Sequence, residues 1–244
     1  MQRLHYIAMS GATARLRELD KLADDLANQN TPGYRAVTYA FSTAIDEETI
    51  GKKGDGKASH IRQVLPVETS LVTQDGPAIQ TGRKLDVRPT EGTWMGVQHP
   101  DGTIAYTRDG RMNVGNDGVL RIGNSAVVGQ GGAAIVTEPD TVPFIDERGR
   151  VFNGDREIGR IGLFQMSGAL ERVGPSQVAP RKGGAAIAVE ANISIGALDG
   201  SNTNGLDSTI SMISAQRSYE QSLQALQTVQ KLDDKANEIG RPRG

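Results

Sequence analysis

Apolar residues near the start of the chain recur with the spacing of an amphipathic helix. From about Leu4 to Asn30 they alternate steps of three and four, the a and d spacing of a coiled-coil seam. Ala8 and Leu22 widen this stripe, and most charged side chains fall on the other face. The pattern predicts a helix whose seam consists of Met9, Ala12, Leu16, Leu19, Ala23 and Leu26.

This helix meets a strong stop signal. Thr31 precedes a proline and is therefore biased away from helical backbone, and Pro32 itself lacks an N–H. Asn30 and Gly33 are typical of helix ends. The segment from Thr31 to Gly33 is either a plain helix stop or the element that sets the direction in which the chain leaves the helix.

A second helical pattern occupies the end of the chain. Asn204 offers an N-cap, and Asp207 places a carboxylate in the first turn, where it favours the helix dipole. The helix is predicted to continue to about Ile239, before Gly240, and to be about 50 Å long at 1.5 Å per residue. Ser222 interrupts its seam. The seam contains Met212, Ala215, Tyr219, Leu226 and Val229, with Ile213 and Leu223 alongside.

Between the two predicted helices, the sequence consists of short runs of β-forming residues separated by turn signals. Asp-Gly and Asn-Gly supply positive φ at little cost and are strong hairpin signals. Such turns are predicted at Pro100-Asp-Gly, Arg108-Asp-Gly, Asn116-Asp-Gly, Glu147-Arg-Gly and Asn153-Gly. Strands are predicted at Thr103–Thr107, Arg111–Val114, Val119–Ile122 and Ile158–Met166.

The predicted fold class is α+β, with long terminal helices forming a coiled-coil-like stalk around a β-rich middle. The expected segments are 1–45 for the first helix and its exit, 46–67 for a flexible linker, 68–198 for the β-rich domain and 199–244 for the last helix. Long helices with such weak aliphatic seams require a partner. The residues of both seams, with Ile213 and Leu223, are therefore predicted to lie in an interface between subunits.

Composition narrows the function. A net charge of −2 gives no electrostatic footprint for nucleic acid or an anionic membrane, and the absence of cysteine excludes thiolate chemistry. No run approaches the roughly 20 apolar residues that span a bilayer, so no membrane insertion is expected. The first 25 residues lack the apolar core of a cleaved signal peptide, so we expect either a cytoplasmic protein or export without cleavage of a leader.

Candidate chemistry is weak throughout. The histidines, His5, His60 and His99, lack catalytic or zinc-binding spacing. The glycine-rich run at Gly129 lacks the Lys-Ser/Thr of a phosphate loop, and Asp233-Asp234 is expected on a solvated helix face. Lys52, Lys53 and Lys57 indicate a solubilising loop, and Trp94 a core anchor. We expect no catalytic residue, cofactor, metal or small-molecule substrate.

Two terminal motifs resemble the signatures of the flagellar axial proteins, which comprise rod, hook and hook-associated subunits. The first runs from Asp25 to Arg35, with Asp25 where the family carries Asn. The second combines Ser201–Asn204 with Met212–Glu220, and Ser222 stands where many members have Asn. The residues that carry the resemblance are Leu26, Ala27, Asn28, Thr31, Pro32, Gly33, Tyr34, Gln216, Arg217 and Tyr219.

The middle of the chain refines this resemblance. Leu85–Val87, Gly92–Val97 and Gly102–Gly110 are similar to the β domain shared by hook and longer rod proteins. The shortest rod proteins lack that domain, and hook proteins are usually much longer. Trp94-Met95, where the distal rod type usually carries Phe-Phe, and the compact length favour the proximal rod type.

The resemblance implies a structural subunit of the basal-body rod in the periplasm, where the rod transmits torque to the hook. It implies export through the flagellar secretion channel and other rod subunits as partners in a helical assembly. Because aliphatic seams this weak do not hold isolated helices, we also expect the terminal helices to be disordered before assembly. The expected neighbours are the MS ring or export gate on one side and the distal rod on the other. A distal rod subunit, a hook-associated protein, a secreted adhesin and a soluble enzyme are the alternatives; the last would need a convergent polar site.

Overall fold

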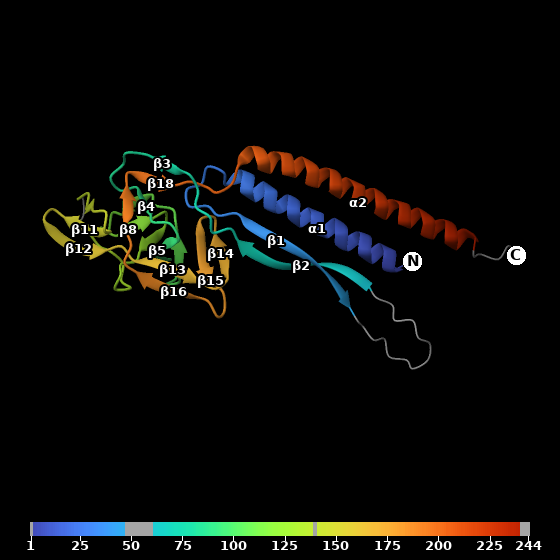
Figure 1. The fold of residues 1–244 in the computed structure, drawn as a ribbon, viewed down its shortest axis with the longest axis horizontal. Helices are drawn as coiled ribbons and strands as arrows, with labels where there is room; N and C mark the ends of the chain where they lie inside the picture. Colours follow the sequence, from blue (N-terminus) through green and yellow to red (C-terminus); the bar gives the residue numbers. More distant parts are fainter. Residues whose placement is uncertain (1, 47–60, 139–140, 240–244) are drawn as a thin grey trace. The chain divides into compact units, whose positions relative to one another are not determined.

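The computed structural model describes residues 2–46, 61–138 and 141–239 (Figure 1). It divides the chain into two compact units, which are described separately below. The first, the helical unit, comprises Met1–Leu26, Tyr39–Thr69 and Gly205–Gly244. The second, the β unit, comprises Ala27–Thr38 and Ser70–Asn204.

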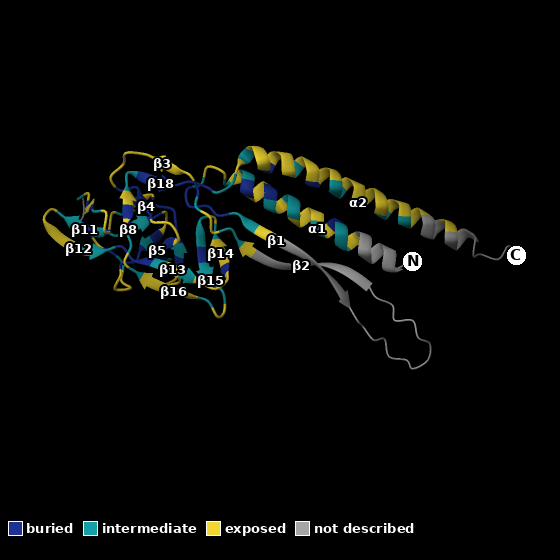
Figure 2. Cartoon of the chain, viewed as in Figure 1, coloured by how far each residue is buried: buried dark blue, intermediate teal, exposed yellow. Residues whose placement is uncertain are grey.

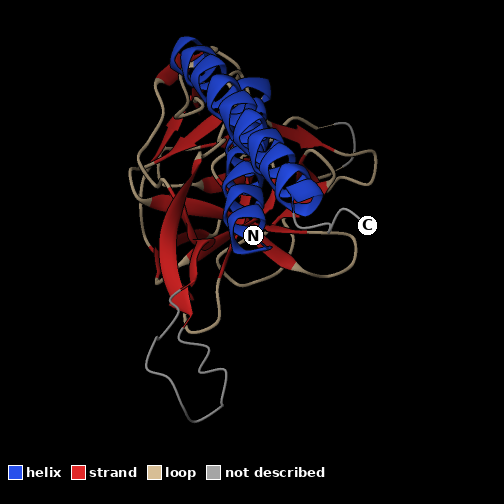
Figure 3. Cartoon of the chain, turned by 90° about the vertical axis from the view of Figure 1, so that its right-hand side faces the viewer, coloured by secondary structure: helices blue, strands red, loops and turns tan. Residues whose placement is uncertain are grey.

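The helical unit consists of two terminal helices and a β-ribbon. Helices α1 (Gln2–Ala27) and α2 (Gly205–Ile239) pack together, side by side in Figures 1 and 3. Strands β1 (Val37–Asp46) and β2 (Ile61–Leu71) form a two-stranded sheet. Both terminal helices and the α+β class are thus confirmed. α1 ends at Ala27 instead of Asn30, because residues 28–30 already form a turn ahead of Pro32.

Part of the predicted linker is a strand. Residues 61–67 lie in β2, where valine and threonine suit extended backbone. Pro66 is compatible with this strand because β2 pairs only with β1 among the described strands and so forms a sheet edge. The remainder of the linker, 47–60, with Lys52, Lys53, Lys57 and His60, lies outside the described residues.

The largest sheet of the β unit contains nine strands. Its main order is β14-β15-β6-β5-β9-β8-β7, and β13 pairs with both β5 and β16. The strands are β5 (Thr93–Gln98), β6 (Ile104–Thr107), β7 (Met112–Val114), β8 (Leu120–Ile122), β9 (Ser125–Val127), β13 (Leu163–Ser167), β14 (Leu170–Gly174), β15 (Gln177–Pro180) and β16 (Ala185–Val189).

Three small sheets complete the β unit. A three-stranded antiparallel sheet has the order β10-β11-β12, and two pairs join β17 to β4 and β18 to β3. The pairs connect segments far apart in sequence, since β3 and β4 precede the large sheet and β17 and β18 follow it. The strands are β3 (Ala78–Gln80), β4 (Val87–Pro89), β10 (Phe144–Ile145), β11 (Arg150–Asn153), β12 (Arg156–Arg160), β17 (Ile193–Ile195) and β18 (Ala197–Asp199).

Four of the five predicted turns connect paired strands. Gly102, Gly118, Gly149 and Gly154 all have positive φ and lie between β5 and β6, β7 and β8, β10 and β11, and β11 and β12. The hairpin prediction at Arg108-Asp-Gly is wrong, because β6 and β7 do not pair with each other. Gly110 is required there for close approach: an added Cβ would lie 1.6 Å from the Val87 carbonyl oxygen.

The strand predicted at Ile158–Met166 is divided in two. β12 ends at Arg160 and pairs with β11, whereas β13 begins at Leu163 and pairs with β5 and β16. Gly162 allows this transfer between sheets, because a Cβ on it would lie 2.8 Å from the Val128 carbonyl oxygen. The other three predicted strands coincide with β6, β7 and β8.

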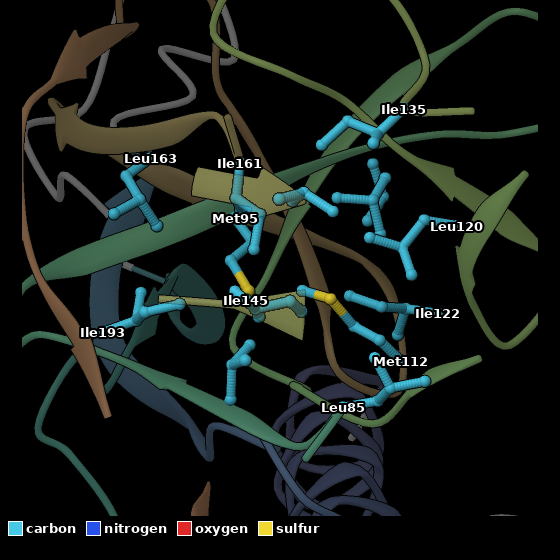
Figure 4. Packing of buried hydrophobic residues seen from close by; sticks show 14 of the residues in the cluster. Leu85, Met95, Met112, Leu120, Ile122, Ile135, Ile145, Ile161, Leu163 and Ile193 are labelled. Carbon is cyan, nitrogen blue, oxygen red and sulfur yellow. The ribbon is translucent and has the colours of Figure 1, made fainter. Parts of the chain in front are cut away.

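The core of the β unit lies between these sheets (Figures 2 and 4). Met95, Met112 and Leu120 have no exposed surface and contact a cluster of leucine, isoleucine and valine. Trp94, the next residue along β5, points to the opposite face of the strand and packs in a second cluster with Leu170 and Val178. Trp94 is 3% exposed, as expected of a core anchor.

Candidate functional site: the terminal helices and their roots

One side of α2 is covered within the helical unit. Seven of its buried or half-buried positions follow alternating steps of four and three: Ser208, Met212, Ala215, Tyr219, Ser222, Leu226 and Val229. Gly205 and Ser218 are half-buried as well. Ser222 continues the seam, because its hydroxyl donates to the Ser218 carbonyl at 2.9 Å and so carries its own partner. The serine that interrupts the pattern in the sequence is therefore compatible with it in the structure.

The opposite side of α2 carries large apolar side chains that keep about half or more of their surface exposed in the described chain. Leu206, Ile210 and Ile213 are 69%, 56% and 49% exposed and lie on one face at helical spacing. A helix that belongs to one isolated molecule normally turns such a stripe inward. This outer stripe, Leu206–Ile210–Ile213, is therefore the candidate contact surface of the helical unit.

The predicted interface residues divide into three groups. Ala12 and Ala215 are buried within this chain, whereas Met9, Leu16, Ala23, Ile213 and Leu223 are exposed. The remaining positions are half-buried: Leu19, Leu26, Met212, Tyr219, Leu226 and Val229. On α1 the buried Leu22 lies to one side of the predicted seam. The role of these residues in contacts between subunits remains a prediction.

The chain leaves α1 through a tightly constrained turn. The Thr31 N–H donates to the Asn28 carbonyl at 3.0 Å, and the Gly33 N–H donates to the Asp199 carbonyl at 2.7 Å. Gly33 has a φ of 73°, and a Cβ on it would lie 2.3 Å from the Asp109 nitrogen. Any other residue at position 33 would therefore be strained and would displace the backbone at Asp109.

Tyr34 and Arg35 follow this turn and are fully buried. The Arg172 guanidinium lies over the Tyr34 ring at 4.6 Å, and Arg172 also donates to the Arg35 carbonyl at 2.5 Å. A cation above an aromatic face is favourable, more so when both are shielded from water. The signature tyrosine is thus held from the strand β14, and its ring does not face solvent.

Arg35 enters a buried charge cluster with Arg108, Asp75 and Asp199. Asp199 accepts hydrogen bonds from both guanidiniums, and Asp75 lies 2.9 Å from Arg108 and 3.5 Å from Arg35. Both arginine side chains are 1% exposed and that of Asp199 is fully buried. Charges this deep persist only when they are paired, so the four side chains depend on one another.

Burial dominates the electrostatics of this cluster. Desolvation lowers the pKa of Arg35 against the attraction of Asp199, and it raises the pKa of Asp75 against that of Arg108. Asp199 Oδ1 and Arg35 Nε are buried without a hydrogen-bond partner in the described part of the chain. Some polar atoms of the cluster thus lack a hydrogen-bond partner in the described residues. Removing one charged member should therefore lower the stability of the β unit strongly.

The side chain of Asn202 joins the same region by three hydrogen bonds. Its Oδ1 accepts from the Ala36 N–H at 2.8 Å, and its Nδ2 donates to the carbonyls of Val72 and Gln74 at 3.0 and 3.2 Å. The segment that follows α1, residues 31–36, and the segment that precedes α2, residues 199–202, are called the helix roots. They are thus bound to each other inside the β unit. The two terminal signatures, distant in sequence, meet here.

The helical signature residues have a different environment. Gln216 and Arg217 are exposed on α2, and Gln216 donates to the Glu220 carboxylate at 3.3 Å. Tyr219 is half-buried on the covered side. At the end of α1, Leu26 is half-buried and Ala27 exposed, while Pro32 is buried.

The described residues do not form a catalytic arrangement. The Ser125 hydroxyl lies 3.0 Å from His99 Nδ1, but Ser125 is 2% exposed, and no third group orients the histidine within the described ranges. The run at Gly129 is not followed by a helix. Among the described residues, none gather as a His, Asp and Glu set that could hold a metal ion, and no helix is long and apolar enough to span a membrane.

Paired terminal helices, helix roots that are bound to each other and an exposed apolar stripe are the features expected of a structural subunit that assembles through helices. A family model described as the C-terminal region of the flagellar basal body rod FlgEFG proteins matches residues 195–239, which contain β18 and α2. The match thus covers one helix root and its helix.

Full-length relatives agree. The chain is 28% identical to the flagellar basal-body rod protein FlgF of Mesorhizobium japonicum, over 98% of this chain and 99% of the relative. It is also 28% identical to FlgF of Salmonella typhimurium, over 96% of both chains, and 26% identical to the rod protein FlgG of Borreliella burgdorferi. The chain is thus similar over nearly its full length to flagellar basal-body rod proteins, among them proteins of the FlgF type.

Proposed function

We propose that this chain polymerises into the proximal part of the flagellar rod through its terminal helices. The observation that carries the proposal is the outer stripe, Leu206–Ile210–Ile213, which stays exposed after α2 has packed. Covering one large aliphatic side chain contributes about 1.5–3 kcal/mol. An assembled neighbour that covers all three would thus supply a substantial driving force.

The geometry of such a contact favours a filament. The covered sides of α1 and α2 already pack against each other within one molecule. The outer stripe of one subunit is therefore expected to contact a different surface of the next subunit. A contact between unlike surfaces whose rotation does not close produces an open helical array. Other rod subunits are therefore the proposed partners, with the MS ring or export gate and the distal rod at the two ends of the stack.

The location and export route are part of the same proposal. The rod lies in the periplasm, and the chain would reach it through the flagellar secretion channel without a cleaved leader. The weak aliphatic seam supports termini that fold only on assembly, because isolated helices with few packing partners are marginal in water. The proposed role is to transmit torque along the drive shaft to the hook.

The experiment is a substitution in the outer stripe. Ile213→Asp places a charge where the proposal requires a dry contact, and Gln221→Asp, at an exposed position of the same helix, is the matched control. Basal bodies are purified from cells that carry each variant and probed for the chain. We expect Ile213→Asp to be lost from the rod fraction and Gln221→Asp to be retained. Equal retention of both would refute the proposed role of the stripe.

A further inference from the structure

The three-stranded sheet β10–β11–β12 has an unusual outer face. Its inner face delivers Ile145 and Val151 to the main core. On the outer face Phe144 is 57% exposed and pairs across the strands with Phe152, with ring centroids 6.2 Å apart. The outer face of an antiparallel sheet is ordinarily polar, yet two of the four phenylalanines of the chain lie here.

Arginines occupy the other end of the same face. Arg150 lies opposite Arg160 in the strand register, and the Arg150 guanidinium covers the Phe152 ring at 5.2 Å. Beside them a cavity of about 320 Å³ is lined by Arg148, Arg150, Arg160, Glu190, Ala191 and Asn192. The face thus passes from an aromatic end to a cationic end.

Two of the arginines are held in place and the third is free. Arg150 is anchored to Asp146 at 2.6 Å, and Arg160 donates to Glu190 at 2.8 Å and to the Arg148 carbonyl at 3.0 Å. The Arg148 guanidinium has no ion pair or hydrogen bond within the described residues. A fixed cationic cavity with one unpaired guanidinium is suited to a carboxylate.

The composition and size of this face suit one kind of contact. Exposed aromatic residues and arginine are the side chains enriched at protein interfaces. Its area is on the order of 200 Å², from strands 4.8 Å apart and about 3.4 Å per residue. A stable interface buries about 800 Å² per partner, so this face fits a secondary contact between subunits already held elsewhere.

A complementary surface is present on the same chain. Met9 and Leu16 are 62% and 45% exposed on α1, and Asp20, exposed on the same face, follows one turn later. Leu16 and Asp20 are about 6 Å apart along the helix. Phe152 and Arg150, which lines the cavity together with Arg148, are about 7 Å apart along the strand. An apolar stripe that ends in a carboxylate thus matches an aromatic face that ends in arginines.

We propose that the outer face of β10–β11–β12 binds the Met9–Leu16–Asp20 stripe of α1 in a second copy of this chain. The aliphatic side chains cover Phe144 and Phe152, and the Asp20 carboxylate accepts hydrogen bonds from the Arg148 guanidinium. The inference rests on the proposed function, because only polymerisation brings two copies together. It adds a second contact, separate from the outer stripe of α2.

Disulfide cross-linking tests this contact directly, since the chain has no cysteine of its own. One copy carries Phe144→Cys and another Leu16→Cys, both are produced in the same cells, and isolated basal bodies are oxidised mildly. We expect a cross-linked dimer in the mixed sample and none with either variant alone. The matched control pairs Leu16→Cys with Ile104→Cys, which is also exposed on the β unit. No cross-link, or as much with Ile104→Cys, would overturn the proposal.

A charge exchange supplies the second arm. Arg148→Glu and Asp20→Arg should each lower incorporation into the rod several-fold, and the two changes combined should restore it. Equal losses in the single and double variants would count against the contact. Basal bodies that contain the chain but give no cross-link refute only this inference. Basal bodies that lack the unmodified chain refute the proposed function as well.

Discussion

Asp199→Asn removes the charge at the centre of the buried cluster and keeps the size of the side chain. In the native chain this carboxylate accepts hydrogen bonds from Arg35 and Arg108, and it lies 3.7 Å from Arg88. After the substitution, Asp75 is the one remaining carboxylate of the cluster for the two buried guanidiniums. The buried region then holds an excess of positive charge.

The expected loss follows from that imbalance. Removal of one partner of a buried ion pair costs about 3–5 kcal/mol, because the other charge remains buried without compensation. Asp75 still lies 2.9 Å from Arg108, so the lower end applies to this cluster. A loss of about 3 kcal/mol lowers the melting temperature of a domain of this size by roughly 6–12 °C.

Trp94 provides the assay, because it is the only tryptophan, is buried in the β unit and lies 5.8 Å from the Arg108 guanidinium. Urea unfolding followed by its fluorescence measures the free energy of unfolding of that unit. The control is Asp117→Asn, which breaks an exposed pair with Arg121 and should leave the free energy of unfolding nearly unchanged. Equal losses from the two substitutions would refute the structural role assigned to the cluster.

Two further predictions concern the β unit. Gly33→Ala should destabilise it by more than about 3 kcal/mol, since strain at positive φ and a clash with the Asp109 backbone add together. Gly123→Ala, at a φ of 59° in open space, should cost only about 1–2 kcal/mol in the same urea titration. Burial raises the pKa of Asp146, but hydrogen bonds from Arg150 outweigh this effect, and the pKa is lowered. The ionised Asp146 therefore stabilises the fold at pH values above the unfolded aspartate pKa of about 3.9. Asp146→Asn should therefore lower the melting temperature at pH 7, and the difference should disappear as the pH falls through the folded pKa; a difference that stays constant down to pH 2 would contradict this linkage.

Local patterns predicted the terminal helices and most of the hairpins. The helix seams repeat over several turns, and Thr31–Gly33 and Asn204 mark ends that depend on neighbouring residues alone. The turns at Gly102, Gly118, Gly149 and Gly154 were also predicted correctly, because a turn between two consecutive strands depends on neighbouring residues. Arg108-Asp-Gly has the same sequence appearance, but its glycine serves a contact with Val87, distant in sequence.

The buried charge cluster was beyond prediction for a related reason. Arg35 was identified only as the end of a signature, and Arg108 only as part of a turn, since charged residues next to turns are ordinarily solvated. Their shared partner, Asp199, lies 164 positions from the first and 91 from the second. The division of Ile158–Met166 between two sheets also depends on partners far along the chain, namely β11, β5 and β16.

The central claim is that the outer stripe of α2 is an assembly surface within the rod. Electron cryomicroscopy of intact basal bodies that contain this chain tests it most directly. The account predicts Leu206, Ile210 and Ile213 buried against a neighbouring subunit, with α1 and α2 paired within each copy. A map in which the three side chains face open solvent, or in which the chain lies outside the rod, would contradict it.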